Sequence, residues 1–127
     1  MAKIIAYADA EIEPVDFSIA PQYATKSVLA KSGLGIEAID FFEYNEAFSL
    51  VVLANSKLLD ISDKKVNVFG GAVALGHPIG MSGARIVQSL LSAFRTKGGK
   101  YGLAGICNGG GGSTAMIIQN LLWDSFI

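Results

Sequence analysis

The stretch YGLAGICNGGGGSTAMIIQ, residues 101–119, decides the fold of this chain. Its two ends, residues 101–106 and 113–119, are rich in apolar and β-branched side chains, which favours two strands. The glycines at 109–112 stand between these runs, and because the runs flank them so closely we interpret them as a tight connection. Such a connection is too short for a crossover, so the second strand is expected to run antiparallel to the first.

Upstream of this pair, strand-like and helix-like runs alternate along the chain. The patterns predict strands at 3–8, 39–44 and 66–69, and helices at about 21–31, 45–59 and 82–96. The complete order is β-α-β-α-β-α-β-β, which predicts an α/β fold with a mixed five-stranded sheet and helices on both faces. No internal repeat or domain boundary is visible, so we expect residues 1–127 to form one domain.

The composition indicates that part of the surface is covered by something else. Hydrophobic residues make up 51% of the 127 residues and charged residues only 17%, against about 25% charged residues in typical domains. The helix expected from Ser82 is small and apolar on nearly all sides in its first half, which favours burial between layers. The missing cover would be another domain or another subunit.

Several functional classes lack support in the sequence. The net charge is −1 and no basic cluster is present, which argues against binding to nucleic acid or to an anionic membrane. One cysteine permits no internal disulfide, which fits a reducing compartment. No apolar run approaches the ~18 residues of a membrane span, and the first residues do not resemble a signal peptide. Neither a dinucleotide-binding fingerprint nor a phosphate-binding loop is present.

Two lone reactive side chains stand out, each in a glycine-rich setting that follows a strand-like run. His77, the only histidine, lies between Gly76 and Pro78, and proline pushes the residue before it towards extended backbone. Cys107, the only cysteine, directly precedes the glycine run. Glycines bring bare N–H groups close to a ligand, an arrangement that can hold and polarise a small acyl group.

Structural alternatives to a catalytic site stay open for these residues. The histidine could be a turn residue bonded to local backbone, and a free cysteine is usually a buried apolar residue. Asn45, at the end of a predicted strand, could be a helix N-cap. Glu46 beside it could be a favourable acid in the first helical turn. A zinc site is disfavoured, because one His and one Cys have no acidic cluster near them.

Three blocks of the chain resemble the C-terminal signature blocks of thiolases, in the order and spacing of that family. They are Asn45-Glu46-Ala47-Phe48, the run from Gly70 to Arg85 that contains Gly76-His77-Pro78, and Cys107-Asn108-Gly109-Gly110-Gly111. The resemblance extends from the first strand to about Leu121, and residues 16–21, 47–55 and 106–112 are similar to the mitochondrial acetoacetyl-CoA branch. Residues 122–127 match no pattern.

The resemblance implies a C-terminal thiolase domain and a role for each site residue. Thiolases interconvert acetoacetyl-CoA plus CoA and two acetyl-CoA through a covalent acyl-cysteine, in fatty acid and ketone body metabolism. His77 would activate the nucleophile and help to hold the thioester oxygen. Cys107 would be the acid/base that moves the substrate proton, Asn45 would fix a water in the first oxyanion hole, and the N–H of Gly109 would be a donor of the second.

The resemblance also sets expectations for partners. The nucleophilic cysteine of the family lies in the N-terminal half, which this chain is expected to lack, so the chain alone is expected to be inactive. Acyl-CoA, CoA, the N-terminal half and a homo-oligomer of the full enzyme are the implied partners, without nucleic acid or membrane. No cofactor is implied, although a monovalent cation stays open, and the implied location is mitochondrial, otherwise cytoplasmic. The alternative function is a non-catalytic binding or assembly module, against which the retention of Asn45, His77 and Cys107 argues.

Overall fold

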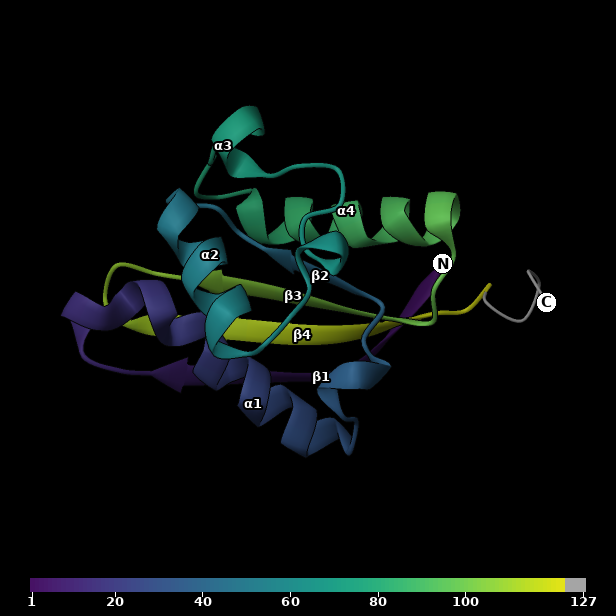
Figure 1. Ribbon diagram of the computed structural model, residues 1–127, viewed down its shortest axis with the longest axis horizontal. Coiled ribbons are helices and arrows are strands. Elements are labelled where there is room, and N and C mark those ends of the chain that lie inside the picture. The colour runs from purple at the N-terminus through teal and green to yellow at the C-terminus, as the bar shows by residue number, and fades with distance from the viewer. Residues whose placement is uncertain (123–127) are drawn as a thin grey trace.

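A mixed four-stranded sheet in the order β1-β4-β3-β2 forms the centre of the molecule (Figure 1). The strands are β1 (Ala2–Glu11), β2 (Phe41–Tyr44), β3 (Tyr101–Cys107) and β4 (Gly112–Asn120). The computed structural model describes residues 1–122. The end of the chain that matches no sequence pattern therefore lies, from residue 123 onwards, outside the described residues.

The hairpin predicted from residues 101–119 is confirmed. Strands β3 and β4 pair antiparallel from Tyr101 opposite Gln119 to Cys107 opposite Ser113. On its other edge β4 pairs antiparallel with β1, so β4 is a central strand. Only β2 runs parallel to its neighbour β3. The backbone N–H of Asn45 then donates to Gly105 O at 2.9 Å, which carries this parallel pairing one residue beyond β2.

The strand predicted at 66–69 is wrong, and the sheet has four strands where the sequence predicts five. This segment makes only isolated bridges, Val66 with Phe42 and Val68 with Gly70. Asn67 is the cause, because its backbone is left-handed (φ 44°) and cannot continue an extended strand. Its side chain instead accepts from Tyr44 N–H and donates to Tyr44 O, both at 2.9 Å, where a neighbouring strand would otherwise bond.

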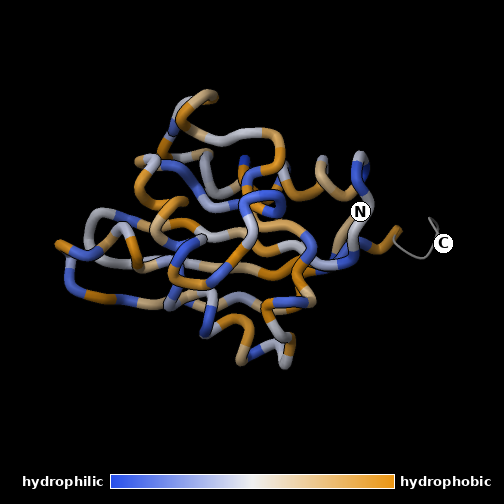
Figure 2. Tube along the Cα trace, viewed as in Figure 1, coloured by the Kyte–Doolittle hydropathy of each residue, from blue (hydrophilic) through white to orange (hydrophobic). Residues whose placement is uncertain are grey.

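Helices cover both faces of the sheet, as predicted. The helical elements are η1 (Pro14–Ile19), α1 (Ala20–Ser32), η2 (Ile36–Ala38), α2 (Ser49–Leu58), η3 (Asp63–Lys65), α3 (Ala72–Leu75) and α4 (Ser82–Lys97). Neighbouring residues of a strand point to opposite faces. Leu103 therefore packs in the cluster under α1, and Ala104 packs against α4. Figure 1 shows these two helices on opposite sides of the sheet, and Figure 2 shows hydrophobic residues along the strands.

Two helix predictions need correction. The helix expected from Asn45 begins at Ser49, because Asn45 extends β2, so Asn45 is not a helix N-cap. The helix from Ser82 has the predicted extent. Ile86 packs on the sheet, whereas Gly83 and Ala84 are exposed in this chain, so their cover by another domain or subunit stays a prediction. Residues 72–75, for which the sequence predicts no helix, form the short helix α3.

Candidate active site

Two segments meet at the carboxyl ends of the parallel strands β2 and β3, the usual location of ligands in α/β sheets. We call residues 70–81 the histidine segment and residues 107–113 the cysteine hairpin. Together with η1 and residues 47–48, which precede α2, they line a pocket of about 620 Å³. The lining residues are Phe17, Ala47, Phe48, His77, Ile79, Ile106, Cys107, Asn108, Gly109 and Thr114. Asn45 is fully buried beside this pocket, in contact with His77.

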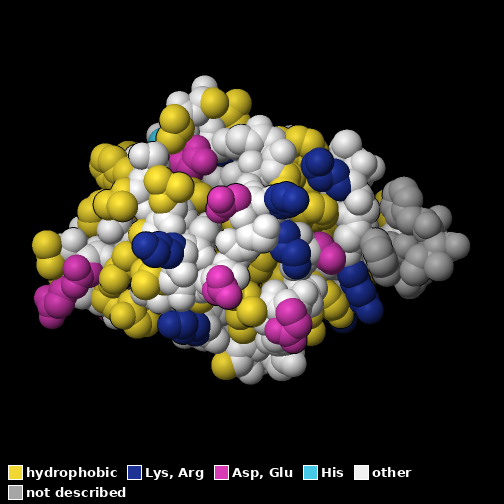
Figure 3. All heavy atoms as spheres, viewed as in Figure 1, with side chains coloured by type: hydrophobic (Ala, Val, Ile, Leu, Met, Phe, Trp, Pro, Cys, Tyr) yellow, Lys and Arg dark blue, Asp and Glu magenta, His cyan; other side chains and the backbone are white. Residues whose placement is uncertain are grey.

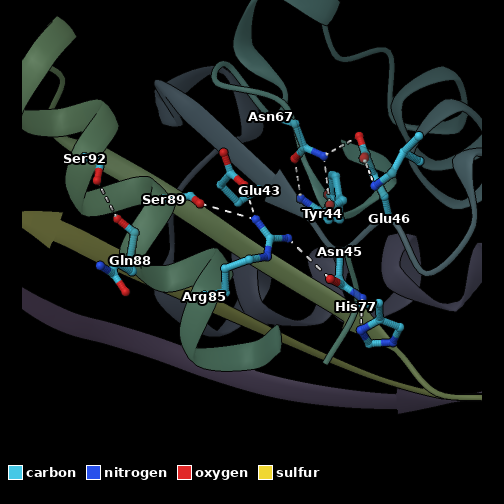
Figure 4. Close-up of polar contacts among 11 residues, drawn as sticks. Glu43, Tyr44, Asn45, Glu46, Asn67, His77, Arg85, Gln88, Ser89 and Ser92 are labelled. Carbon is cyan, nitrogen blue, oxygen red and sulfur yellow. Dashed lines mark hydrogen bonds and ion pairs between the residues drawn. The ribbon is translucent and has the colours of Figure 1, made fainter. Parts of the chain in front are cut away.

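His77 is held by side chains rather than by local backbone. Its Nδ1 atom lies 2.6 Å from Ser82 Oγ, at the start of α4, and 3.4 Å from Asn45 Nδ2 (Figure 4). With Nδ1 occupied, Nε2 is the ring nitrogen that remains available to a ligand. The interpretation as a turn histidine bonded to its own backbone is therefore wrong.

Glu46 anchors the histidine segment. One of its carboxyl oxygens accepts from Val73 N–H at 2.9 Å, and the other accepts from Asn67 Nδ2 at 3.1 Å (Figure 4). Gly71 allows this close approach, because a Cβ atom there would lie 2.6 Å from the Glu46 carboxyl carbon. Glu46 is thus not the first-turn acid of a helix. The sequence shows it as part of a signature block, but not which segment it holds.

The cysteine hairpin closes through Asn108. The Asn108 side-chain oxygen accepts from Gly110 N–H at 2.9 Å and from Gly112 N–H at 3.3 Å. The backbone of Asn108 accepts from Gly111 N–H at 3.2 Å and donates to Gly112 O at 2.8 Å. Within residues 1–122, no group accepts a hydrogen bond from Gly109 N–H. One unused backbone donor is therefore left in the residue that lines the pocket two positions after Cys107.

Cys107 is the last residue of β3, and only 9% of its surface is exposed. Burial raises the pKa of its thiol, because desolvation disfavours the thiolate. The thiol is therefore protonated at neutral pH. A protonated thiol beside a pocket can give its proton to a ligand and take it back.

Two buried ionisable side chains, Glu43 and Arg85, lie close together beside Asn45. Arg85, on α4, donates from Nη2 to Asn45 Oδ1 at 3.3 Å, and its Nη1 lies 3.9 Å from Glu43 Oε2 (Figure 4). Glu43 is only 1% exposed, and burial raises its pKa to about 8 although the Arg85 charge opposes this shift. Sequence reasoning missed Glu43, and it named Arg85 only as the end of a signature block, without a role. Glu43 stands inside a predicted strand, and nothing in the sequence pairs it with a residue of a distant helix.

Apolar side chains dominate the mouth of the pocket. Phe17 and Phe48 meet edge to face with ring centroids 5.9 Å apart. Exposed hydrophobic side chains of η1, of residues 48–53 and of the histidine segment include Val15, Phe48, Leu50, Leu53, Val73 and Leu75. Figure 3 shows hydrophobic side chains gathered on the left and at the top of this face. A largely apolar pocket with a few convergent polar groups suits a small organic ligand.

Two other kinds of site lack support in the part of the chain that the structure describes. Among residues 1–122, no three His, Cys, Asp or Glu side chains gather where they could hold a metal ion. Across the same residues, the helices are too short or too polar to span a membrane.

Comparison with known proteins identifies a family. The model of a family described as the C-terminal domain of thiolase matches residues 1–120. The mitochondrial acetyl-CoA acetyltransferase of Homo sapiens is 63% identical over 121 residues, which are 95% of this chain and 28% of that protein. The protein of the same name from Danio rerio is 58% identical over 119 residues, which are 94% of this chain and 28% of the relative.

Solved structures agree with this match. The Acat5 thiolase of Ascaris suum, crystallised in complex with coenzyme A, superposes with a TM-score of 0.90 at 51% identity, over 95% of this chain and 31% of that one. The acetyl-CoA acetyltransferase of Bacillus anthracis gives a TM-score of 0.92 at 41% identity, with the same coverage. The chain thus spans less than a third of the length of the proteins that it matches.

Proposed function

Since this chain belongs to the thiolase family, we propose that residues 1–127 are the C-terminal catalytic domain of an acetyl-CoA C-acetyltransferase. The proposed reaction interconverts acetoacetyl-CoA plus CoA and two acetyl-CoA. One observation carries the proposal: His77, Cys107 and the unused N–H of Gly109 line the same pocket of about 620 Å³. A proton-transfer group and donors for oxygen are the groups that a thioester enolate requires.

In the thiolysis direction, the proposed chemistry begins outside this chain. A cysteine thiolate from the rest of the enzyme attacks C3 of acetoacetyl-CoA, and the C2–C3 bond breaks. The electron pair moves to C2, and the Cys107 thiol gives its proton to that carbon, which yields acetyl-CoA and an acetyl-cysteine. The Cys107 thiolate then takes the proton of the CoA thiol, and the CoA sulfur displaces the acetyl group as a second acetyl-CoA.

Two oxygens carry negative charge along this path, and the site offers donors for both. We assign the thioester oxygen of the enolate to His77 Nε2 and to a water held by Asn45. The oxygen on the attacked carbon is assigned to Gly109 N–H, the one hairpin amide that Asn108 leaves available. Prearranged donors of this kind stabilise a charge as it develops, at no reorganisation cost in the reaction step.

The state of the Cys107 thiol supports its assigned role. An ordinary cysteine has a pKa of about 8.5, and burial raises the pKa of Cys107 above its usual value. The thiol therefore starts as an acid, ready to protonate the enolate carbon. It cannot also be the acylated nucleophile in the same cycle, because an acylated sulfur has no proton to give.

The proposed partners follow from these roles. The nucleophile is supplied by the part of the enzyme that corresponds to the remaining length of the relatives, so we propose assembly with that part. Acyl-CoA and CoA are the substrates, in line with the relative whose structure holds coenzyme A. A homo-oligomer and a mitochondrial location are proposed because the curated relatives are mitochondrial enzymes.

A reconstitution assay tests this function. The chain is mixed with the complementary N-terminal part of the human relative, and the loss of acetoacetyl-CoA absorbance is followed after CoA is added. The mixture should turn over substrate while the chain alone does not, and Cys107→Ser should lower the rate by roughly 10³-fold or more, since members of a catalytic unit act together. A chain that is fully active alone, an assembled but inactive mixture, or an unimpaired Cys107→Ser variant would each contradict the proposal.

A further inference from the structure

We propose that Arg85 is a positioning residue that fixes the tautomer of His77, through the side chain of Asn45. Three contacts carry this inference: Arg85 Nη2 to Asn45 Oδ1 at 3.3 Å, Asn45 Nδ2 to His77 Nδ1 at 3.4 Å, and Ser82 Oγ to the same Nδ1 at 2.6 Å. Figure 4 shows the first two as a chain from α4 to the histidine segment.

The chain of contacts begins with a side chain that can only donate. The guanidinium of Arg85 has five N–H donors, no acceptor, and a charge that it keeps at all relevant pH values. It is 9% exposed and lies between Glu43, Ser89 and Asn45. The atom of Asn45 that faces Arg85 must therefore be the carbonyl oxygen, because an amide NH₂ there would point its hydrogens at other hydrogens.

This constraint decides what Asn45 presents to His77. Asn45 is fully buried, so the side chains packed around it set the orientation of its amide. With Oδ1 turned to Arg85, the NH₂ group faces His77 Nδ1, and an amide NH₂ can only donate. Nδ1 must then be the bare, accepting nitrogen, and the proton of the neutral ring sits on Nε2.

The Ser82 hydroxyl does not determine the tautomer of His77; it adapts to the tautomer that Asn45 determines. A hydroxyl can donate or accept, so its 2.6 Å contact with Nδ1 fits either tautomer. Its proton has a second possible acceptor, Pro78 O at 3.2 Å. With Asn45 holding Nδ1 bare, the Ser82 hydroxyl donates to the ring. Without that constraint, Ser82 could accept from Nδ1–H and donate to Pro78 O, which is the opposite tautomer.

The tautomer determines what His77 offers to a ligand at Nε2, the ring nitrogen that Asn45 and Ser82 do not contact. Nε2 carries a hydrogen, so His77 meets a ligand oxygen as a hydrogen-bond donor. That use of the donor rests on the proposed function, whereas the tautomer itself does not. If the tautomer is as stated and the reconstituted enzyme is inactive, only the proposed function fails.

Nitrogen NMR of the imidazole tests the inference directly, because the chain has a single histidine. The ¹⁵N-labelled chain is recorded at a pH where the ring is neutral, and the shifts of the two ring nitrogens report which one is protonated. The wild-type chain should show Nε2–H. A wild-type spectrum with Nδ1–H would overturn the proposal without any variant.

Variants then separate positioning by Arg85 from a general structural role. Asn45→Asp keeps the size and the oxygen that faces Arg85, but turns a second oxygen to His77, so the ring should carry a proton on Nδ1. Glu43→Gln with Arg85→Met removes the Arg85 charge together with the Glu43 carboxyl and frees the Asn45 amide, so the ratio of Nε2–H to Nδ1–H should fall roughly fivefold to tenfold. Ser82→Ala is the control and should keep Nε2–H.

Each variant has an outcome that would contradict the inference. An Asn45→Asp spectrum that still shows a bare Nδ1 would contradict the inference, as would a Ser82→Ala variant that alone inverts the tautomer. Amide spectra check that each variant is folded. If the double variant does not fold, the isosteric Asn45→Asp variant and the wild-type spectrum still test the proposal.

Discussion

The two segments that enclose the pocket are held in place in different ways. The cysteine hairpin closes on itself, through the Asn108 side chain and backbone. The histidine segment depends on side chains from outside it: Glu46 holds Val73, and Asn45 and Ser82 hold His77. Cys107 is thus placed by residues next to it in sequence, and His77 by residues from other elements. The two sides of the site can therefore be perturbed separately.

The largest expected effect is a loss of stability on Gly→Ala substitution, which should differ between the two segments because their glycines have different amounts of space around them. A Cβ atom at Gly111 would lie 2.1 Å from Ile12 O, and its backbone is left-handed (φ 89°). Gly111→Ala should therefore cost more than about 4 kcal/mol of unfolding free energy, or prevent folding. In the histidine segment a Cβ atom at Gly80 meets nothing within 4 Å, so Gly80→Ala should change stability by less than about 1 kcal/mol. Urea unfolding of both variants checks this, and equal stabilities would contradict the comparison.

The next effect is a pH dependence of the free energy of unfolding, which comes from Glu43 on the histidine side of the site. The folded pKa of Glu43 is about 8 against an ordinary 4.5, so between these values the folded chain binds a proton that the unfolded chain has lost. The free energy of unfolding should then fall as the pH rises from about 5 to 8, by at most about 1.4 kcal/mol per pH unit from this group. Glu43→Gln should remove that slope, as measured by urea unfolding across the pH range.

The matched control for the pH dependence lies in the hairpin. Asn108→Ala leaves Glu43 and its surroundings unchanged, so it should lower stability at every pH and retain the wild-type slope. A Glu43→Gln variant with the full wild-type slope would show that another group titrates there.

The smallest expected effects are local changes in hydrogen exchange, and each should be confined to one of the two segments. Glu46→Ala removes the acceptor of Val73 N–H and should speed hydrogen exchange of that amide, by up to about tenfold for one lost hydrogen bond. Asn108→Ala should do the same for the amides of Gly110 and Gly112. Each variant should leave the other segment's amides unchanged. If one variant accelerates exchange on both sides, the two segments are coupled and the comparison is wrong.

Local sequence signals predicted the parts of the fold that local forces determine. The β3–β4 hairpin follows from apolar runs that flank glycines, and α1 ends where Gly33 adopts a left-handed φ of 72°. The strand at 66–69 failed because a buried Asn67 side chain bonds to Tyr44, a contact between segments that are distant in sequence. The helix start at 45 failed for a similar reason, since pairing with β3 keeps Asn45 extended.

The site residues likewise fall into those that could be predicted from local sequence and those that could not. His77 and Cys107 could be found because each is the only residue of its type and stands among glycines. Their convergence was expected because each follows a strand-like run, and it is found although residues 66–69, before His77, form no strand. The Glu43–Arg85 pair and the anchoring role of Glu46 were not predictable, because they connect a strand end with a helix and a loop much later in the chain.

In the proposed function, both segments act on one ligand in one pocket. The most direct measurement is an NMR titration of the ¹⁵N-labelled chain with acetoacetyl-CoA, which follows the His77 ring nitrogens and the Gly109 amide together. Both signals should move with the same saturation curve, while amides at the far end of the sheet stay still. Movement of only one of the two, or of neither while other parts of the chain respond, would contradict this proposal.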